Sequence, residues 1–206
     1  MHARQHWEHV YATKPVDQVS WFQPHAASSL RLIEDTGVAK SAPIVDIGGG
    51  ASVLVDDLLA HGYSNISVLD ISGNALARSR ARLAERAAEV RWIESDVLEA
   101  ALPEHSCEIW HDRAAFHFLT SAEDRNTYRR AALRAIRPGG YLIIATFAAD
   151  GPERCSGLPV VRYDASALHA ALGEEFELVH HENESHRTPA GNEQRFMLAS
   201  FRKIAQ

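Results

Sequence analysis

The stretch IWHDRAAFHFL, residues 109–119, gathers several side chains that could do chemistry. His111, Asp112 and His117 are candidate catalytic groups because imidazole and carboxylate can transfer protons, and Arg113 could bind an anion. The stretch is compatible with a catalytic base and its carboxylate, a metal cluster, part of a cofactor pocket or the end of a buried strand. The elements that position it have to decide between these alternatives.

Short apolar runs alternate with segments of helical spacing through the middle of the chain. Strands buried on both faces are predicted at APIVDIG, ISVLDIS, EVRWIESD, CEIWHDR and YLIIATF. Helices are predicted at 26–35 and at SVLVDDLLAHG, GNALARSRARLAERAA and AEDRNTYRRAALRAIRPGG, the last ended by Pro138 and two glycines. This alternation predicts an α/β fold, a doubly wound parallel sheet with helices on both faces.

The alternation of predicted strands and helices ends after residue 148. AADGPERCSGLPVVRYD reads as a long loop and ASALHAALG as a short helix. EFELVHHENES and NEQRFMLASFRK then read as two strands around a turn at TPAGN, which predicts an antiparallel C-terminal hairpin. The opening stretch is placed by this pattern at the carboxyl tip of the fourth strand.

Composition limits the possible partners. The chain has 206 residues, 46% hydrophobic and 23% charged, which suits one domain over residues 1–206 with a core at 40–147, preceded by 1–36 and followed by 148–206. A net charge of −6 argues against nucleic acid as a primary partner, and no apolar run is long enough to span a membrane. Two cysteines cannot form a disulfide framework, so we expect reduced thiols in a cytoplasmic protein of undetermined oligomeric state.

VDIGGGAS follows the first predicted strand and opens a helix, the place where a glycine-rich turn lets the backbone approach a ligand. Asp70 ends the second strand about 20 residues on, the spacing at which a carboxylate holds ribose hydroxyls. A dinucleotide fits poorly, because Val53 stands where the third glycine is needed and Asp46 would repel a pyrophosphate. The pattern therefore predicts an adenosine-containing ligand that carries positive charge, unless the glycines form an ordinary strand–helix turn.

In this order, VDIGGGAS, VLDIS, ESDV and RPGG resemble the successive motifs of class I S-adenosylmethionine-dependent methyltransferases, over roughly residues 40–147. The predicted hairpin also resembles the end of that family's Rossmann-like seven-stranded sheet, which is mostly parallel with an antiparallel C-terminal strand. The resemblance implies S-adenosyl-L-methionine as cofactor. Ser52 departs from the pattern, since many relatives have glycine there.

The resemblance also implies positions for cofactor-binding residues. Gly48, Gly49 and Gly50 would lie along the methionine part, with Asp46 near its ammonium group. Asp70 would hold the ribose, and Ile71 would pack on the adenine. The ESDV motif would place Ser95, Asp96 and Val97 at the adenine, with Asp96 accepting from the amino group.

The N-terminal segment WEHVYATKPVDQVSWFQ resembles a lid found in a subset of these enzymes, including thiopurine-methyltransferase-like and some protein-lysine methyltransferases. This implies that Trp7, Tyr11 and Trp21 contact the cofactor and that Trp21 and Phe22 contact the substrate. The alternative is an N-terminal helix that docks on the sheet through its aromatic residues.

Further substrate-binding candidates come from the loops beyond the strands. They are Arg113, Cys155, Arg162 and His186, with Arg187 and Arg195 also in reach, and the arginines would suit an anionic acceptor. Cys155 could equally be a small buried filler. The twelve histidines are scattered without ligand-pair spacing, so we expect no metal site.

Neighbouring residues on a strand tip point in alternating directions. We therefore expect one of His111 and Asp112 to line the methionine end and the other to hold the loop, with His117 facing substrate. Methyl transfer to a small-molecule acceptor with a soft or heteroatom nucleophile is the first hypothesis. The alternatives are a protein (lysine) methyltransferase and a non-catalytic adenosylmethionine-binding module.

Overall fold

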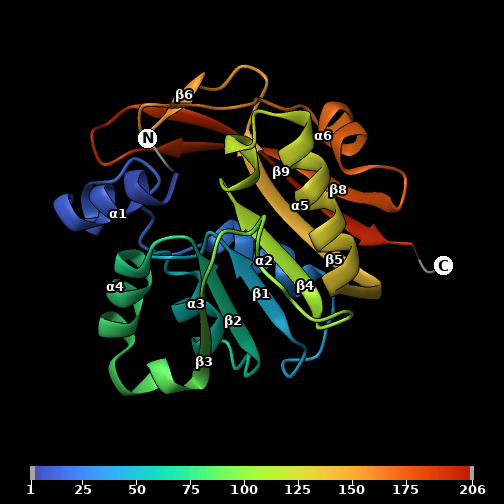
Figure 1. Ribbon diagram of the computed structural model, residues 1–206, viewed down its shortest axis with the longest axis horizontal. Helices are drawn as coiled ribbons and strands as arrows, with labels where there is room; N and C mark the ends of the chain where they lie inside the picture. The colour runs from blue at the N-terminus through green and yellow to red at the C-terminus, as the bar shows by residue number, and fades with distance from the viewer. Residues whose placement is uncertain (1–2, 205–206) are drawn as a thin grey trace.

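The computed structural model describes residues 3–204 and has a central sheet of seven strands (Figure 1). The strands lie in the order β3-β2-β1-β4-β5-β9-β8. They are β1 (Ile44–Ile47), β2 (Ile66–Asp70), β3 (Val90–Glu94), β4 (Cys107–Arg113), β5 (Ile136–Phe147), β8 (Phe176–Arg187) and β9 (Glu193–Lys203). The first five run parallel, and β9 is antiparallel to both neighbours. The predicted fold class is confirmed.

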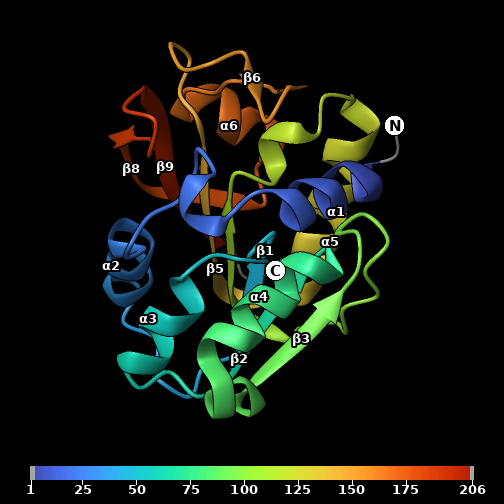
Figure 2. The same cartoon turned by 90° about the vertical axis from the view of Figure 1, so that its left-hand side faces the viewer.

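Helices cover both faces of this sheet, as Figure 2 shows. They are α1 (Ala3–Thr13), α2 (Ala27–Asp35), α3 (Leu54–Ala60), α4 (Gly73–Leu83), α5 (Ala122–Ala135) and α6 (Ala165–Leu172). Ile33 of α2 and Leu58 of α3 belong to one buried cluster, whereas Tyr128 of α5 and Leu168 of α6 belong to another. None of the described helices is long and apolar enough to cross a membrane.

The two clusters meet the sheet through alternating side chains. On β4, Ile109 and Trp110 are both fully buried, yet they belong to different clusters because successive strand residues point to opposite faces. This double burial explains why the strands read as continuous apolar runs in the sequence.

Strand order reverses between β1 and β4, which are hydrogen-bonded neighbours although β2 and β3 separate them in the chain. Their register sets Asp46 beside His111 and Ile47 beside Asp112. Ligands of doubly wound sheets bind beyond the carboxyl ends of the strands at such a switch point. The polar residues that end β1, β2 and β4 are therefore brought to one edge.

Two predicted boundaries differ from the structure. The helix predicted over residues 73–88 ends at Leu83, where Ala84 has a φ of 51°, and continues as a 3-10 segment, Ala84–Glu89. β5 begins at Ile136 and includes the RPGG motif, because a register shift opposite Cys107 and Ile109 absorbs the irregular backbone. A Cβ on Gly140 would lie 2.7 Å from the Glu108 carbonyl oxygen, so only glycine allows this close pairing.

The segment after β5, predicted as a loop, contains a two-stranded hairpin. Its strands are β6 (Arg154–Cys155) and β7 (Leu158–Pro159), paired antiparallel. Ser156 and Gly157 turn between them with φ angles of 49° and 79°. The hairpin lies next to α1, where His6 Nε2 is 3.3 Å from Ser156 Oγ (Figure 1).

Candidate active site

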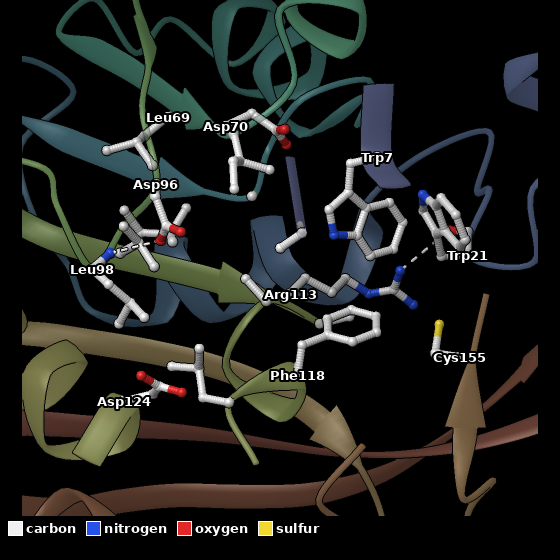
Figure 3. Close-up of a pocket in the computed structure, with 18 of the residues that line it drawn as sticks. Trp7, Trp21, Leu69, Asp70, Asp96, Leu98, Arg113, Phe118, Asp124 and Cys155 are labelled. Carbon is white, nitrogen blue, oxygen red and sulfur yellow. Dashed lines mark hydrogen bonds between the residues drawn. The ribbon is translucent and has the colours of Figure 1, made fainter. Parts of the chain in front are cut away.

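A cavity of about 290 Å³ lies beyond the carboxyl ends of β1, β2 and β4 (Figure 3). Its lining includes the polar residues Asp70, Ser95, Asp96, Arg113, Asp124, Cys155 and Gln194. The remaining lining is mostly apolar and includes Trp7, Tyr11, Trp21, Gly48, Ile71, Val97, Leu98, Phe118, Leu119 and Phe196. Such an apolar cavity with a few convergent polar groups is typical of a small-molecule site.

Asp70 is held firmly at the end of β2. Its Oδ1 accepts a hydrogen bond from the Ser72 amide at 2.8 Å. A Cβ on Gly50 would lie 2.4 Å from Asp70 Oδ2, so the glycine turn leaves room for this carboxylate. Burial raises the pKa of Asp70 to about 7, and the Asp46 carboxylate nearby also raises it.

Asp96 follows β3 in a turn that its own side chain stabilises. Its Oδ1 accepts from the Leu98 amide at 2.9 Å, which fixes the direction of the side chain. Ser95, Asp96 and Val97 line one end of the cavity together with Ile71. The two motifs that end β2 and β3 are therefore brought together there.

Asp46 of β1 lies outside the larger cavity, in a buried chain of hydrogen bonds. His111 Nδ1 lies 2.7 Å from Asp46 Oδ1, and His111 Nε2 lies 2.9 Å from Ser29 Oγ on α2. Asp46 Oδ2 is buried and has no partner among the described residues. Asp46, Gly48 and Gly49 line a second, smaller cavity of about 50 Å³ that adjoins the first through Gly48. His111 lines neither cavity, so the structure gives it a supporting position behind Asp46.

Asp112 points to the other face of the sheet and does not reach either cavity. It is fully buried and accepts from the Ala115 amide at 2.8 Å, the Phe116 amide and the Tyr128 hydroxyl at 2.7 Å. Burial raises its pKa to about 6, while these donors lower it. Asp112 therefore holds the loop after β4 instead of acting at the cavity.

Arg113 reaches both cavities from the tip of β4. Its guanidinium lies 4.7 Å from the centre of the Phe196 ring and donates to the Trp21 carbonyl at 3.4 Å and to Glu184 at 3.5 Å. Figure 3 shows it between Trp21 and Phe118. It is thus a partly buried cation held by long hydrogen bonds.

Three residues predicted to face the substrate or act in catalysis lie away from the cavities. His117 is fully buried in a 3-10 turn, and burial together with Arg113 lowers its pKa to about 3. His186 is bonded to the Ser20 carbonyl at 2.8 Å, and Arg162 is bonded to Gly151 and Glu153 at the surface. Packing and backbone partners hold all three elsewhere.

The N-terminal aromatic residues do lie at the cavity. Trp7 packs edge-on against Trp21 at 5.6 Å and Phe118 at 5.1 Å between ring centres, and Tyr11 lies 6.2 Å from Trp21. Phe22 lines the smaller cavity. Cys155 also lines the larger one, and burial raises the pKa of its thiol to about 11.

Several lining residues were not predicted. Leu98, Phe118, Leu119, Asp124, Gln194 and Phe196 line the larger cavity, and Ser29 supports His111. Leu98, Phe118 and Leu119 adjoin or lie within predicted motifs, so proximity in sequence could have found them. Gln194 and Phe196 lie on β9, whose place beside β5 comes from the sheet topology and not from a local pattern.

Comparison with known proteins decides the family. Residues 45–144 match a family described as a methyltransferase domain. Residues 45–144 form a methyltransferase domain. The match covers the strands and helices that place Asp46, Asp70 and Asp96 around the cavities.

Relatives of this methyltransferase domain differ in what they act on. EEF1A lysine methyltransferase 2 of Danio rerio is 28% identical over 123 residues, which are 57% of this chain and 53% of that protein. The chain spans about half the length of the curated relatives that it matches.

Solved structures share the fold over nearly the whole chain. One, from work on the conversion of a disulfide bond into a thioacetal group during echinomycin biosynthesis, has a TM-score of 0.79 at 18% identity and covers 98% of this chain and 94% of its own. The 1,6-didemethyltoxoflavin-N1-methyltransferase of Burkholderia thailandensis was solved with S-adenosylhomocysteine. It has a TM-score of 0.71 at 19% identity, and the match covers 98% of this chain and 87% of that protein's chain. The predicted methyltransferase family is confirmed over residues 45–144, and the predicted fold over nearly the whole chain.

The methyltransferase domain also has residues that fit this cofactor. A buried carboxylate oxygen without a partner is costly, and an ammonium group at Asp46 Oδ2 would satisfy it. Asp70 and Asp96 each present a carboxylate, anchored through one oxygen by a backbone amide, to the larger cavity, where ribose and adenine donors can bind. Among residues 3–204, no group of three or more His, Cys, Asp or Glu side chains is placed to hold a metal ion.

Proposed function

We propose that this chain is an S-adenosylmethionine-dependent methyltransferase that acts on a small-molecule acceptor. The observation that carries the proposal is the larger cavity, which runs from Asp70 and Asp96 to an aromatic end with Arg113 and Cys155 (Figure 3). One end has the polar groups for a nucleoside, and the other has room and charge for a second molecule.

In this proposal Asp46 holds the ammonium group of the cofactor, Asp70 its ribose hydroxyls and Asp96 its adenine amino group. Ser29 and His111 keep Asp46 in position from behind. The bound cofactor supplies a methyl group on a sulfonium, whose neutral thioether is a good leaving group. The task of the protein is then to align the acceptor and exclude water, which can contribute several kcal/mol to catalysis.

The N-terminal segment closes this site in the proposal. Trp7 contacts Trp21 and Phe118 across the cavity, and Arg4 of α1 bonds Glu94 at 2.9 Å beside the adenine end. α1 also packs on α4, where Arg78 donates to the Tyr11 carbonyl. We propose that this helix acts as a lid and that residues 1–206 form one domain, since β8 and β9 belong to the same sheet as the core strands.

A protein-lysine methyltransferase is the second candidate, favoured by the likeness to the lysine methyltransferase of Danio rerio. The aromatic closure over the cavity favours the small molecule instead, because a lysine on a folded protein has to enter past Trp7 and Trp21. A non-catalytic cofactor-binding module would not need the second, aromatic end. Both cysteines are free thiols, which supports a reducing compartment such as the cytoplasm.

Labelling of a cell extract tests the proposal. The protein is incubated with methyl-labelled S-adenosylmethionine and extract, and the products are separated by size. We expect label in the small-molecule fraction that depends on the protein and is reduced with Asp70→Ala at a limiting concentration of S-adenosylmethionine. Label confined to polypeptides would support the lysine enzyme, and no transfer to any fraction would contradict both enzyme proposals.

A further inference from the structure

The end of the larger cavity away from Asp96 has a chemistry of its own. Figure 3 shows Trp7, Trp21, Arg113, Phe118 and Cys155 there, well separated from Asp96, Leu98 and Asp124. Phe196 adds a further ring beside Arg113. If the proposed function is right, this end receives the methyl acceptor.

Aromatic side chains line this end of the larger cavity, and their ring planes are nearly perpendicular. The rings of Trp7 and Trp21 are inclined by 81° and those of Trp7 and Phe118 by 74°. Trp7 contacts the other two rings edge-to-face, and all three side chains line the cavity, where an aromatic ligand can stack or pack edge-on with them. The shape favours a planar acceptor over a flexible aliphatic chain.

Arg113 supplies the charge at this end. Its side chain is 14% exposed and its two side-chain hydrogen bonds, to Trp21 and Glu184, are long at 3.4 and 3.5 Å. A guanidinium has five N–H donors, so Arg113 can donate further hydrogen bonds to a ligand. Glu184 offsets part of the positive charge, which favours a ligand with a single delocalised negative charge over a phosphate.

The titratable groups near this end are not available as bases. His117 is held in a turn behind the cavity, and His186 is bonded to the Ser20 carbonyl. His6 packs on Trp7 but is not part of the cavity lining, and its Nε2 lies 3.3 Å from Ser156 Oγ. Asp70 lines the cavity but holds the ribose in the proposed function. Burial raises the pKa of the Cys155 thiol to about 11 and raises that of the Tyr11 hydroxyl further, so both stay protonated near neutral pH. Glu184 is paired with Arg113, and Asp124 lies at the other end. An acceptor there therefore has to present its lone pair without help from the protein.

We propose that the acceptor is a planar, weakly acidic aromatic or heteroaromatic compound that reacts as its own conjugate base. The inference rests on the proposed function and narrows its substrate class. The acceptor's lone pair forms the new bond to the methyl carbon while the carbon–sulfur bond breaks. The products are the methylated acceptor and S-adenosylhomocysteine, and no proton passes to the protein, because the acceptor has lost it to water beforehand.

Two acceptors that differ only in acidity test this directly. Methylation of 4-nitrobenzenethiol and of 4-methoxybenzenethiol is followed as a function of pH, with the uncatalysed rate subtracted. We expect each kcat/KM profile to rise around the pKa of the thiol used, so the two midpoints separate. A common midpoint for both thiols would show that a group on the protein removes the proton and would overturn the inference.

Cyclohexylamine and a lysine-containing peptide serve as base-requiring comparison acceptors. We expect transfer to the thiols to exceed transfer to these amines by at least about tenfold, the effect of about 1.4 kcal/mol. Equal or greater transfer to the amines would overturn the inference while leaving the proposed methyltransferase function intact. Loss of transfer to all acceptors, including a whole extract, would instead contradict the proposed function.

Arg113→Met and Arg162→Met form a matched pair, because Arg162 is bonded at the surface away from the cavity. We expect Arg113→Met to weaken binding of 4-nitrobenzenethiolate to the protein loaded with S-adenosylhomocysteine by about tenfold, measured by the absorbance of the thiolate. Arg162→Met should bind it as the parent does. If Arg113→Met weakens binding of S-adenosylhomocysteine alone and not of the thiolate, Arg113 belongs to the cofactor and the assignment is wrong.

Discussion

Asp46 shows how one residue can be prepared for a ligand by its neighbours. One of its oxygens is bonded to His111, which is bonded in turn to Ser29 of α2, and the other oxygen is buried without a partner among the described residues. The chain of bonds fixes the carboxylate, and Asp46 lines the smaller cavity. His111, a catalytic candidate in the sequence, thus supports the residue that we propose binds the ammonium group of the cofactor.

Asp46→Asn is expected to weaken binding of S-adenosylhomocysteine by about 1–3 kcal/mol, the cost of a lost charge-assisted hydrogen bond. Binding of 5′-methylthioadenosine, which lacks the amino-acid end, should stay the same. Titration calorimetry with both ligands measures this, with the exposed Asp35→Asn as control. Equal weakening of both ligands would place Asp46 elsewhere in the site.

Asp70 predicts a pH dependence of cofactor binding. Its pKa is raised to about 7, and ribose hydroxyls favour its ionised form, so binding lowers that pKa. Affinity is then full above pH 7 and falls as the pH drops through 7, by at most about tenfold per unit. Calorimetry with S-adenosylhomocysteine between pH 6 and 8.5 should show this for the parent, whereas Asp70→Asn should give a nearly flat profile. A parent profile as flat as that of the variant would contradict this role.

At the scale of elements, the tip of β4 is joined to α5 by buried polar contacts. The Tyr128 hydroxyl donates to Asp112 at 2.7 Å and accepts from Trp110 Nε1 at 2.8 Å, while Asp112 holds the loop amides. This network positions the turn Phe116–Phe118, from which Phe118 reaches the cavity. The same network therefore contributes to the stability of the fold and to the shape of the aromatic end of the cavity.

Tyr128→Phe is expected to lower the free energy of unfolding by about 1–3 kcal/mol, because it leaves the buried Trp110 indole N–H without a partner and removes one of the donors to Asp112. Urea denaturation measures the loss, and Tyr141→Phe, at a partly buried position within β5, is the matched control. An equally small loss in both variants would show that the network contributes little.

Sequence reasoning predicted the elements well because buried parallel strands and their helices leave strong periodic signals. It also found the ends of β1, β2 and β3, where glycines and carboxylates follow each strand at characteristic spacings. It could not place His117, His186 and Arg162. Their direction depends on a 3-10 turn, on the register of β8 and on the packing of the β6–β7 hairpin, none of which has a local pattern.

At the scale of the whole molecule, both ends of the chain contribute to one cavity. Trp7 from α1 and Gln194 and Phe196 from β9 line it together with the ends of the core strands. The aromatic end is completed only when the C-terminal hairpin has paired with β5. Loss of the overall fold therefore removes the acceptor end along with the cofactor end.

Acid sensitivity of the fold is expected from His117. Its pKa falls from 6.5 to about 3 on folding, so between these values the unfolded chain binds a proton that the folded chain does not. Stability from this group is present above pH 6.5 and is lost as the pH falls toward 3. When the pH is lowered from 7.5 to 5.5, the free energy of unfolding should therefore fall by about 1 kcal/mol less in His117→Phe than in the parent. Urea denaturation at the two pH values measures this. The exposed His181→Phe should behave as the parent, and an unchanged pH dependence in His117→Phe would contradict the assignment.

Titration calorimetry with S-adenosylhomocysteine and NAD tests the central claim most directly, since the cavity at the switch point is assigned to the methyltransferase cofactor. We predict that S-adenosylhomocysteine binds, that NAD does not, and that Asp70→Ala weakens the binding by about 1–3 kcal/mol. Binding of NAD alone, or an unchanged dissociation constant in Asp70→Ala, would contradict the assignment.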